Sequence, residues 1–152
     1  MAREVFELTS VAIPELERLI KRFDENSSIR KAFINKFFLA VQNKKMPELE
    51  RIYTSDKQLF YAILGDLESI HKETRERLSK FLYVEEIREA LKLIEVEIVI
   101  LRHVEKNFFK QKFDKIDLND LRTQLSTLYN FVNKSEKEDI MTLSRKIKQI
   151  SA

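Results

Sequence analysis

The sequence contains no cysteine, one glycine and only two prolines among its 152 residues. Without cysteine the chain forms no disulfide, thiolate metal site or thiol nucleophile, which excludes zinc fingers, iron–sulfur clusters and cysteine enzymes. A sheet of many short strands needs turn residues. Because these amount to Gly65, Pro14 and Pro47, the sequence favours an all-α fold.

Long uncharged apolar runs are also missing, and residues 1–6 contain no apolar signal core. We therefore expect a cytoplasmic protein that neither crosses nor binds a membrane.

The net charge of +3 comes from 28 basic and 25 acidic residues. Such a near balance permits nucleic-acid binding without indicating it.

The segment 84–109 has the strongest helical pattern in the chain. Its apolar residues form two stripes at helical spacing, which are Val84, Ile87, Leu91, Ile94, Ile98, Leu101 and Phe108, and Leu93, Val96, Ile100 and Val104. The two stripes together leave a polar strip on the rest of the helix surface, which holds Lys92, Glu95, Arg102, His103 and Lys106. This pattern predicts one unbroken helix with neighbours on both flanks.

The remaining segments predict shorter helices on either side of this one. Pro14 and Pro47 suit first helical turns, and Asp117 is a candidate N-cap. Ser55 with Gln58, and Ser135 with Glu138, have capping-box spacing. In the second helix the pattern places Ile29, Phe33, Phe37, Ala40 and Val41 on the apolar face and Arg30, Lys31, Lys36, Lys44 and Lys45 outside. We predict a single-domain bundle over 1–152, with about six helices around the long central one.

Two constellations are candidates for chemistry. Glu68 and His71 have the Glu-x-x-His spacing of diiron bundles, but the other histidine, His103, follows Ile100 rather than a glutamate. The favoured interpretation is that both histidines are surface residues. Glu97 and Glu105 project into the apolar arc of the central helix, where a carboxylate is either a general acid or base or the partner of a neighbouring Lys or Arg. We favour the pairing, and predict no catalytic residue, cofactor, metal site or small-molecule substrate.

Basic and aromatic residues interleave after the central helix, as they do on single-stranded nucleic-acid surfaces. The candidate contacts are Lys106, Lys110, Lys112 and Lys115, among Phe108, Phe109 and Phe113. The alternative function is therefore a small nucleic-acid-binding subunit of a ribonucleoprotein complex of the CRISPR-effector type.

Protein association is the function that the composition favours. Eleven Phe and four Tyr, with several apolar stripes, are more than a monomeric core of this size needs. The predicted partner interface, for a homo- or hetero-oligomer, consists of Leu91, Ile94, Ile98, Leu101 and Phe108. We expect a non-enzymatic scaffold or interaction subunit.

The segment 47–132 resembles the α-helical domain of the GINS replication-factor family, in its archaeal form. The similar stretches are Pro47–Tyr53, Asp56–Tyr61, Ala90–Lys106 and Leu121–Val132, in this order and with similar lengths. The resemblance implies a subunit of a heteromeric scaffold that joins the replicative helicase to a RecJ-like protein. The chain departs from the family in its extra residues 1–45 and in 133–152, which read as helix where GINS subunits commonly carry a small β-domain.

Overall fold

The computed structural model describes residues 7–151, and these form helices without any strand. The all-α bundle is therefore confirmed for this part of the chain. The helical elements are η1 (Leu8–Ala12), α2 (Ile13–Glu25), α3 (Ser27–Gln42), α4 (Met46–Ser55), α5 (Lys57–Arg77), η2 (Ser79–Phe81), α6 (Glu85–Val104), η3 (Glu105–Phe109), η4 (Phe113–Lys115), α7 (Leu118–Asn130), η5 (Phe131–Ser135) and α8 (Glu136–Ser151).

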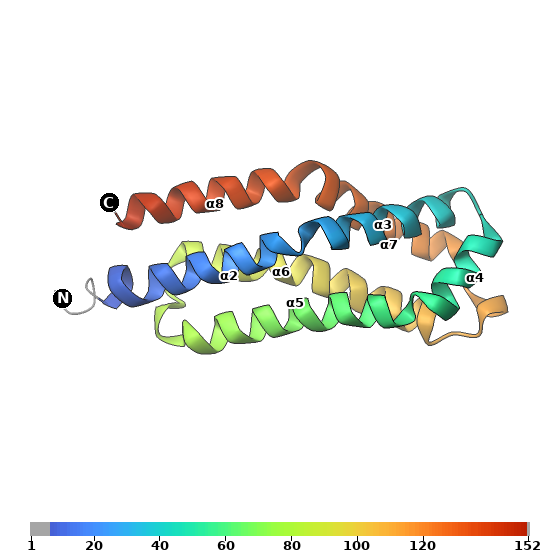
Figure 1. The fold of residues 1–152 in the computed structure, drawn as a ribbon, viewed down its shortest axis with the longest axis horizontal. Coiled ribbons are helices and arrows are strands. Elements are labelled where there is room, and N and C mark those ends of the chain that lie inside the picture. The colour runs from blue at the N-terminus through green and yellow to red at the C-terminus, as the bar shows by residue number, and fades with distance from the viewer. Residues whose placement is uncertain (1–6, 152) are drawn as a thin grey trace.

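The long helices line up as four antiparallel columns (Figure 1). The first column is α2 followed by α3, the second is α5, the third is α6 with η3, and the fourth is α7, η5 and α8. The short helix α4 closes one end of the bundle, and the described ends of the chain lie at the other. Helix α6 packs against α5, α7 and α8, while α2 contacts α5 and α8. The expected neighbours on both flanks of the central helix are present.

The predicted central helix is a continuous helical rod. Val84 is extended, α6 begins at Glu85, and after Val104 the backbone widens into the π-helical turn Glu105–Phe109 without leaving the helical region. Such a turn adds a residue to the helical register. It places Phe108 and Phe109 together in the core.

The chain reverses between α3 and α4 through a tight turn. Lys45 N–H donates to the Ala40 carbonyl at 2.9 Å and Lys44 N–H to the Val41 carbonyl at 3.2 Å, which is the Schellman pattern. Lys44 has a φ of 52°, in the left-handed region. Pro47 then lies in the first turn of α4, as predicted.

Of the three predicted N-caps, one is confirmed. The Asp117 side chain accepts from the backbone N–H groups of Asn119 and Asp120. The Ser55 capping box was wrong, because α5 begins at Lys57 with no side-chain cap. The Ser135 capping box was also wrong: the helix continues through η5, and the Ser135 hydroxyl donates to the Phe131 carbonyl.

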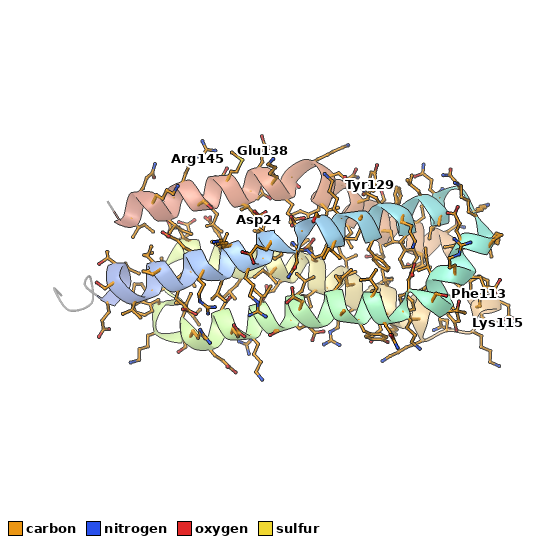
Figure 2. The ribbon with its side chains drawn as sticks, in the orientation of Figure 1. Asp24, Phe113, Lys115, Tyr129, Glu138 and Arg145 are labelled. Atoms are coloured by element: carbon orange, nitrogen blue, oxygen red, sulfur yellow. The ribbon has the colours of Figure 1, made fainter. Side chains whose placement is uncertain are left out.

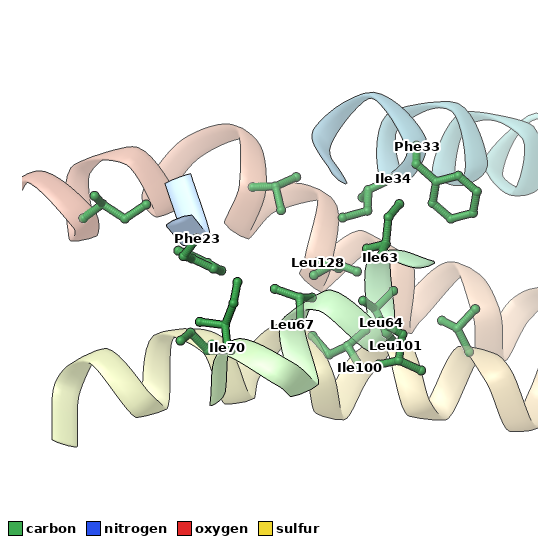
Figure 3. Close-up of a cluster of buried hydrophobic side chains, with 14 of the residues drawn as sticks. Phe23, Phe33, Ile34, Ile63, Leu64, Leu67, Ile70, Ile100, Leu101 and Leu128 are labelled. Atoms are coloured by element: carbon green, nitrogen blue, oxygen red, sulfur yellow. The ribbon is translucent and has the colours of Figure 1, made fainter. Parts of the chain in front are cut away.

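One continuous apolar core runs the length of the bundle. Figure 3 shows part of it, where Phe23, Leu67, Ile70, Ile100 and Leu128 come from four different helices. Near α4 the core is aromatic, and its rings pack with centroids 4.5–6.5 Å apart; they are Phe33, Phe37, Tyr53, Phe60, Tyr61, Phe108, Phe109 and Phe113. The many aromatic residues therefore fill the chain's own interior at this end.

Candidate functional site

Three charged side chains meet inside the bundle. Arg30 of α3 is 2% exposed, Glu97 of α6 is 0% and Glu136, the first residue of α8, is 4%. Arg30 Nη2 donates to Glu136 Oε1 at 2.9 Å, and Arg30 Nε lies 3.5 Å from Glu97 Oε2. The guanidinium carbon is 4.2 Å from the ring centroid of Phe23, a cation–π arrangement. This buried charge cluster joins three columns of the bundle.

The two carboxyl groups of the cluster share one cation. The pKa of Glu97 is raised to about 8, first by burial and then by the neighbouring Glu136 carboxylate, against the opposing effect of Arg30. Burial also raises the pKa of Glu136, which Arg30 again opposes. Glu136 accepts the guanidinium hydrogen bond from Arg30 Nη2, so its charged form is the better stabilised. At neutral pH the cluster is thus a protonated Glu97 beside an Arg30–Glu136 ion pair.

The expected pairing of Glu97 with a basic residue is therefore present, and its partner is Arg30. The prediction that Arg30 lies outside was wrong, as was the prediction that Ile29 faces the core, since Ile29 is 53% exposed. Glu105 is only partly buried, with carboxylate oxygens 3.9 Å from Arg102 Nη1 and 4.0 Å from Lys110 Nζ.

The histidines are separate from this cluster and from each other. His71 Nε2 lies 2.9 Å from Glu95 Oε1, and His103 Nε2 lies 2.8 Å from Asp120 Oδ2. Within residues 7–151 no group of three or more His, Asp or Glu side chains is arranged to hold a metal ion. Glu68 instead forms an ion pair with Arg102.

The side of α6 that faces away from the bundle carries a regular line of residues, which we name the outer stripe. Its members follow one another in alternating steps of three and four and are Glu89, Lys92, Val96, Val99, His103 and Lys106. Val96 is 41% exposed and Val99 is 67% exposed, which is unusual for two valines on one helical face. The stripe ends at Lys106 in η3, because the residue added by the π-helical turn shifts the register beyond it.

A groove of about 350 Å³ runs beside the outer stripe, between α6 and α8. Its apolar lining consists of Leu93, Val96, Phe131 and Leu143. Lys146 spans the groove to the Glu89 carboxylate at 3.2 Å. Val96 therefore borders a hollow that an apolar side chain of another molecule can enter.

The residues predicted as the partner interface lie in the chain's own core. Leu91, Ile94, Leu101 and Phe108 are buried, and Ile98 is half-buried against the same core. Their surface is covered by α5, α7 and α8 rather than left for a partner. The exposed apolar residues of α6 are Val96, which the sequence placed on the second stripe, and Val99, which it placed on neither.

The four candidate nucleic-acid contacts, Lys106, Lys110, Lys112 and Lys115, are all exposed. Figure 2 labels Phe113 and Lys115 at the end of the bundle near α4. The neighbouring rings do not accompany the lysines to the surface, because Phe108 and Phe109 are buried and Phe113 packs on Tyr53 at 5.3 Å. The predicted surface of alternating basic and aromatic residues is therefore basic only, since the lysines are exposed and the rings of Phe108 and Phe109 belong to the core.

Arg30 and Glu136 were missed as members of the cluster, although the sequence carries a signal for each. Arg30 precedes Ile34 and Phe37 by helical steps of four and seven, and Glu136 lies four residues after Val132 and four before Ile140. Both charged residues therefore interrupt an otherwise buried stripe. Glu97 interrupts the apolar arc of α6 in the same way, and these three charged residues meet in the buried charge cluster.

No protein-family model, curated protein or solved structure proved similar to this chain. None of the helices within residues 7–151 is long and apolar enough to cross a lipid bilayer.

Proposed function

We propose that the chain is a non-enzymatic helical subunit of a multiprotein complex, and that it binds its partner through the outer stripe of α6. The observation that carries the proposal is the exposure of Val96 and Val99 on one face of α6, where Val96 also lines the groove with Phe131 and Leu143. Exposed apolar residues next to a hollow and rimmed by charges are typical of protein interaction sites.

The energetics favour a helical partner. Burying a valine side chain contributes on the order of 1.5 kcal/mol, and two valines beside an apolar groove form a small hot spot of the kind that anchors helix pairs. The rim adds Glu89, Lys92 and Lys106, whose charges select the partner and its orientation. A helix that presents small apolar residues between acidic and basic side chains fits this surface.

A subunit of a GINS-like replication assembly is the more specific form of this proposal. Its support is the resemblance of residues 47–132, a range that α4, α5, α6 and α7 cover in the expected order. Under this form the partners are sister subunits and the proteins that the scaffold joins at the replication fork.

Site-specific crosslinking tests the interaction surface. A photo-reactive amino acid at position 99 is expected to crosslink to a protein in native host extract, whereas the same group at the exposed position 72 on α5 is not. Replication-fork proteins among the position-99 products would support the GINS-like form. Equal products from positions 99 and 72 would contradict the proposal.

The second candidate function is nucleic-acid binding through Lys106, Lys110, Lys112 and Lys115, and the exposure of all four favours it. Contacts to phosphates release counterions, so this function requires affinity for single-stranded DNA or RNA that falls steeply with added salt. Substituting the four lysines by glutamine should then weaken binding roughly uniformly across sequences. An interaction subunit instead shows little affinity for DNA or RNA, and its position-99 crosslinks persist when only Lys112 and Lys115, which lie outside the outer stripe, are substituted.

A further inference from the structure

The outer stripe of α6 has a charge pattern that is complementary to itself when reversed. Its midpoint falls between Glu97 and Ile98, and each member has a counterpart at an equal distance on the other side. The pairs are Val96 with Val99, Lys92 with His103, and Glu89 with Lys106. The acidic Glu89 thus lies at one end, the basic Lys106 at the other, and the apolar residues at the centre.

We propose that the partner of the outer stripe is a second copy of this chain, bound antiparallel about a two-fold axis through this midpoint. This inference rests on the proposed function and names the partner of the same surface. A two-fold contact uses the same patch on both subunits, so residue i meets residue j and residue j meets residue i. Only a patch that is complementary to its own reversal can form such a contact.

The antiparallel orientation follows from the charges. In this orientation Glu89 of each copy faces Lys106 of the other, so two opposite-charge pairs flank the central valines. A parallel arrangement in register would place Glu89 against Glu89 and Lys106 against Lys106, which is repulsive. The stripe therefore disfavours parallel pairing.

The inner pairs fit the same arrangement. Val96 of one copy faces Val99 of the other, and because Val96 borders the groove, the second copy's Val99 can enter it beside Phe131 and Leu143. Lys92 meets the second copy's His103, whose ring lies 2.8 Å from the Asp120 carboxylate. That carboxylate supplies the countercharge for Lys92. The alternating steps of four and three are the spacing by which paired helices keep a common seam.

Mass measurements of the full-length chain test the pairing. Sedimentation equilibrium should give twice the chain mass of 18.2 kDa for the wild type, with dissociation on dilution. Val99→Glu should raise the dimer Kd roughly 100-fold, because it buries a charge at the centre of the contact. The matched control is Val11→Glu, since Val11 is 58% exposed but lies outside the stripe, and it should leave the Kd unchanged.

Charge exchange tests the register without touching the valines. Glu89→Lys and Lys106→Glu should each raise the Kd about tenfold at low salt, since like charges then face each other. The double variant should recover wild-type affinity, and an equimolar mixture of the two single variants should form the heterodimer. Because Glu89 also pairs with Lys146, thermal unfolding of each variant should first show that the bundle is intact.

The outcomes separate this inference from the proposed function. A wild type that stays monomeric up to about 0.5 mM overturns the self-pairing, as does a dimer that survives Val99→Glu or a double variant without recovery. A monomer whose position 99 crosslinks to another protein leaves the proposed function standing. A monomer without such crosslinks overturns both.

Discussion

Arg30 and Glu136 are 106 residues apart in the sequence and share a hydrogen bond of 2.9 Å in the interior of the bundle. Through this contact the first turns of α3 and α8 are held together by charge rather than by apolar packing alone. Glu97 of α6 completes the group, so one guanidinium ties three columns at mid-length.

Removing the guanidinium should destabilise the whole bundle. Arg30→Met keeps an unbranched apolar side chain but leaves two buried carboxyl groups without a cation, and breaking a buried ion pair on one side costs about 3–5 kcal/mol. The cost should be larger at pH 8 than at pH 5, because protonation relieves the remaining carboxylates. Urea denaturation measures both values. The control is Lys31→Met, an exposed neighbour on α3, and a loss for Arg30→Met no greater than the control's would contradict the assigned role.

Glu97 should make the free energy of unfolding fall as pH rises. Its folded-state pKa is about 8 against an ordinary value near 4.5, so between these two values the folded chain holds a proton that the unfolded chain has released. Stability falls with pH wherever the folded state binds more protons. The contribution is therefore constant below about pH 4.5, declines from there to about pH 8 and is constant above.

Glu97→Gln isolates this effect, since the amide resembles the protonated carboxyl and does not titrate. In this variant the free energy of unfolding should fall much less between pH 4.5 and pH 8, and at pH 8 it should exceed that of the wild type. Chemical denaturation across the pH range measures both. Glu50→Gln, an exposed substitution on α4, should keep the wild-type slope. An unchanged slope in Glu97→Gln would show that the proton is held elsewhere.

Local patterns predicted the parts of this fold that depend on neighbouring residues. The spacing of apolar residues over 84–109 was sufficient for the continuous helix, and the Asp117 cap depends on backbone groups two and three residues away. Glu97 stood out because a charge inside an apolar arc is visible from one helix. Its pairing with a basic side chain followed from the cost of an unpaired buried charge.

The identity of its partners could not be predicted in this way. Ile29 and Arg30 are adjacent, and an apolar face drawn through Ile29 has the same helical spacing as the true face through Arg30. Tertiary contacts with Glu97 and Glu136 decide which of them is buried. The interface prediction also mistook core residues for surface, because the pattern of one helix does not show how many neighbours cover it.

The aromatic end of the core should be sensitive to truncation. Phe108 is fully buried, with ring centroids 4.8 Å from Phe37, 4.9 Å from Phe109 and 5.4 Å from Tyr53. Phe108→Ala should cost about 3–5 kcal/mol through lost burial and the cavity that remains. The partly exposed Phe113 is the comparison, and its change to alanine should cost clearly less in the same denaturation experiment. Equal losses would contradict the central position of Phe108 in this cluster.

The turn between α3 and α4 offers a stabilising substitution. Lys44 occupies the left-handed position of the Schellman turn with a φ of 52°, where a residue with a Cβ costs roughly 1–2 kcal/mol and glycine costs nothing. Lys44→Gly also makes the unfolded chain more flexible, which returns part of the gain. The net increase in the free energy of unfolding should be about 0.5–1 kcal/mol. At Lys45, with a φ of −79°, the same substitution relieves no strain, so Lys45→Gly should lower the stability. Thermal or urea unfolding of the two variants tests this prediction. If Lys44 is left-handed, the free energy of unfolding rises in Lys44→Gly and falls in Lys45→Gly.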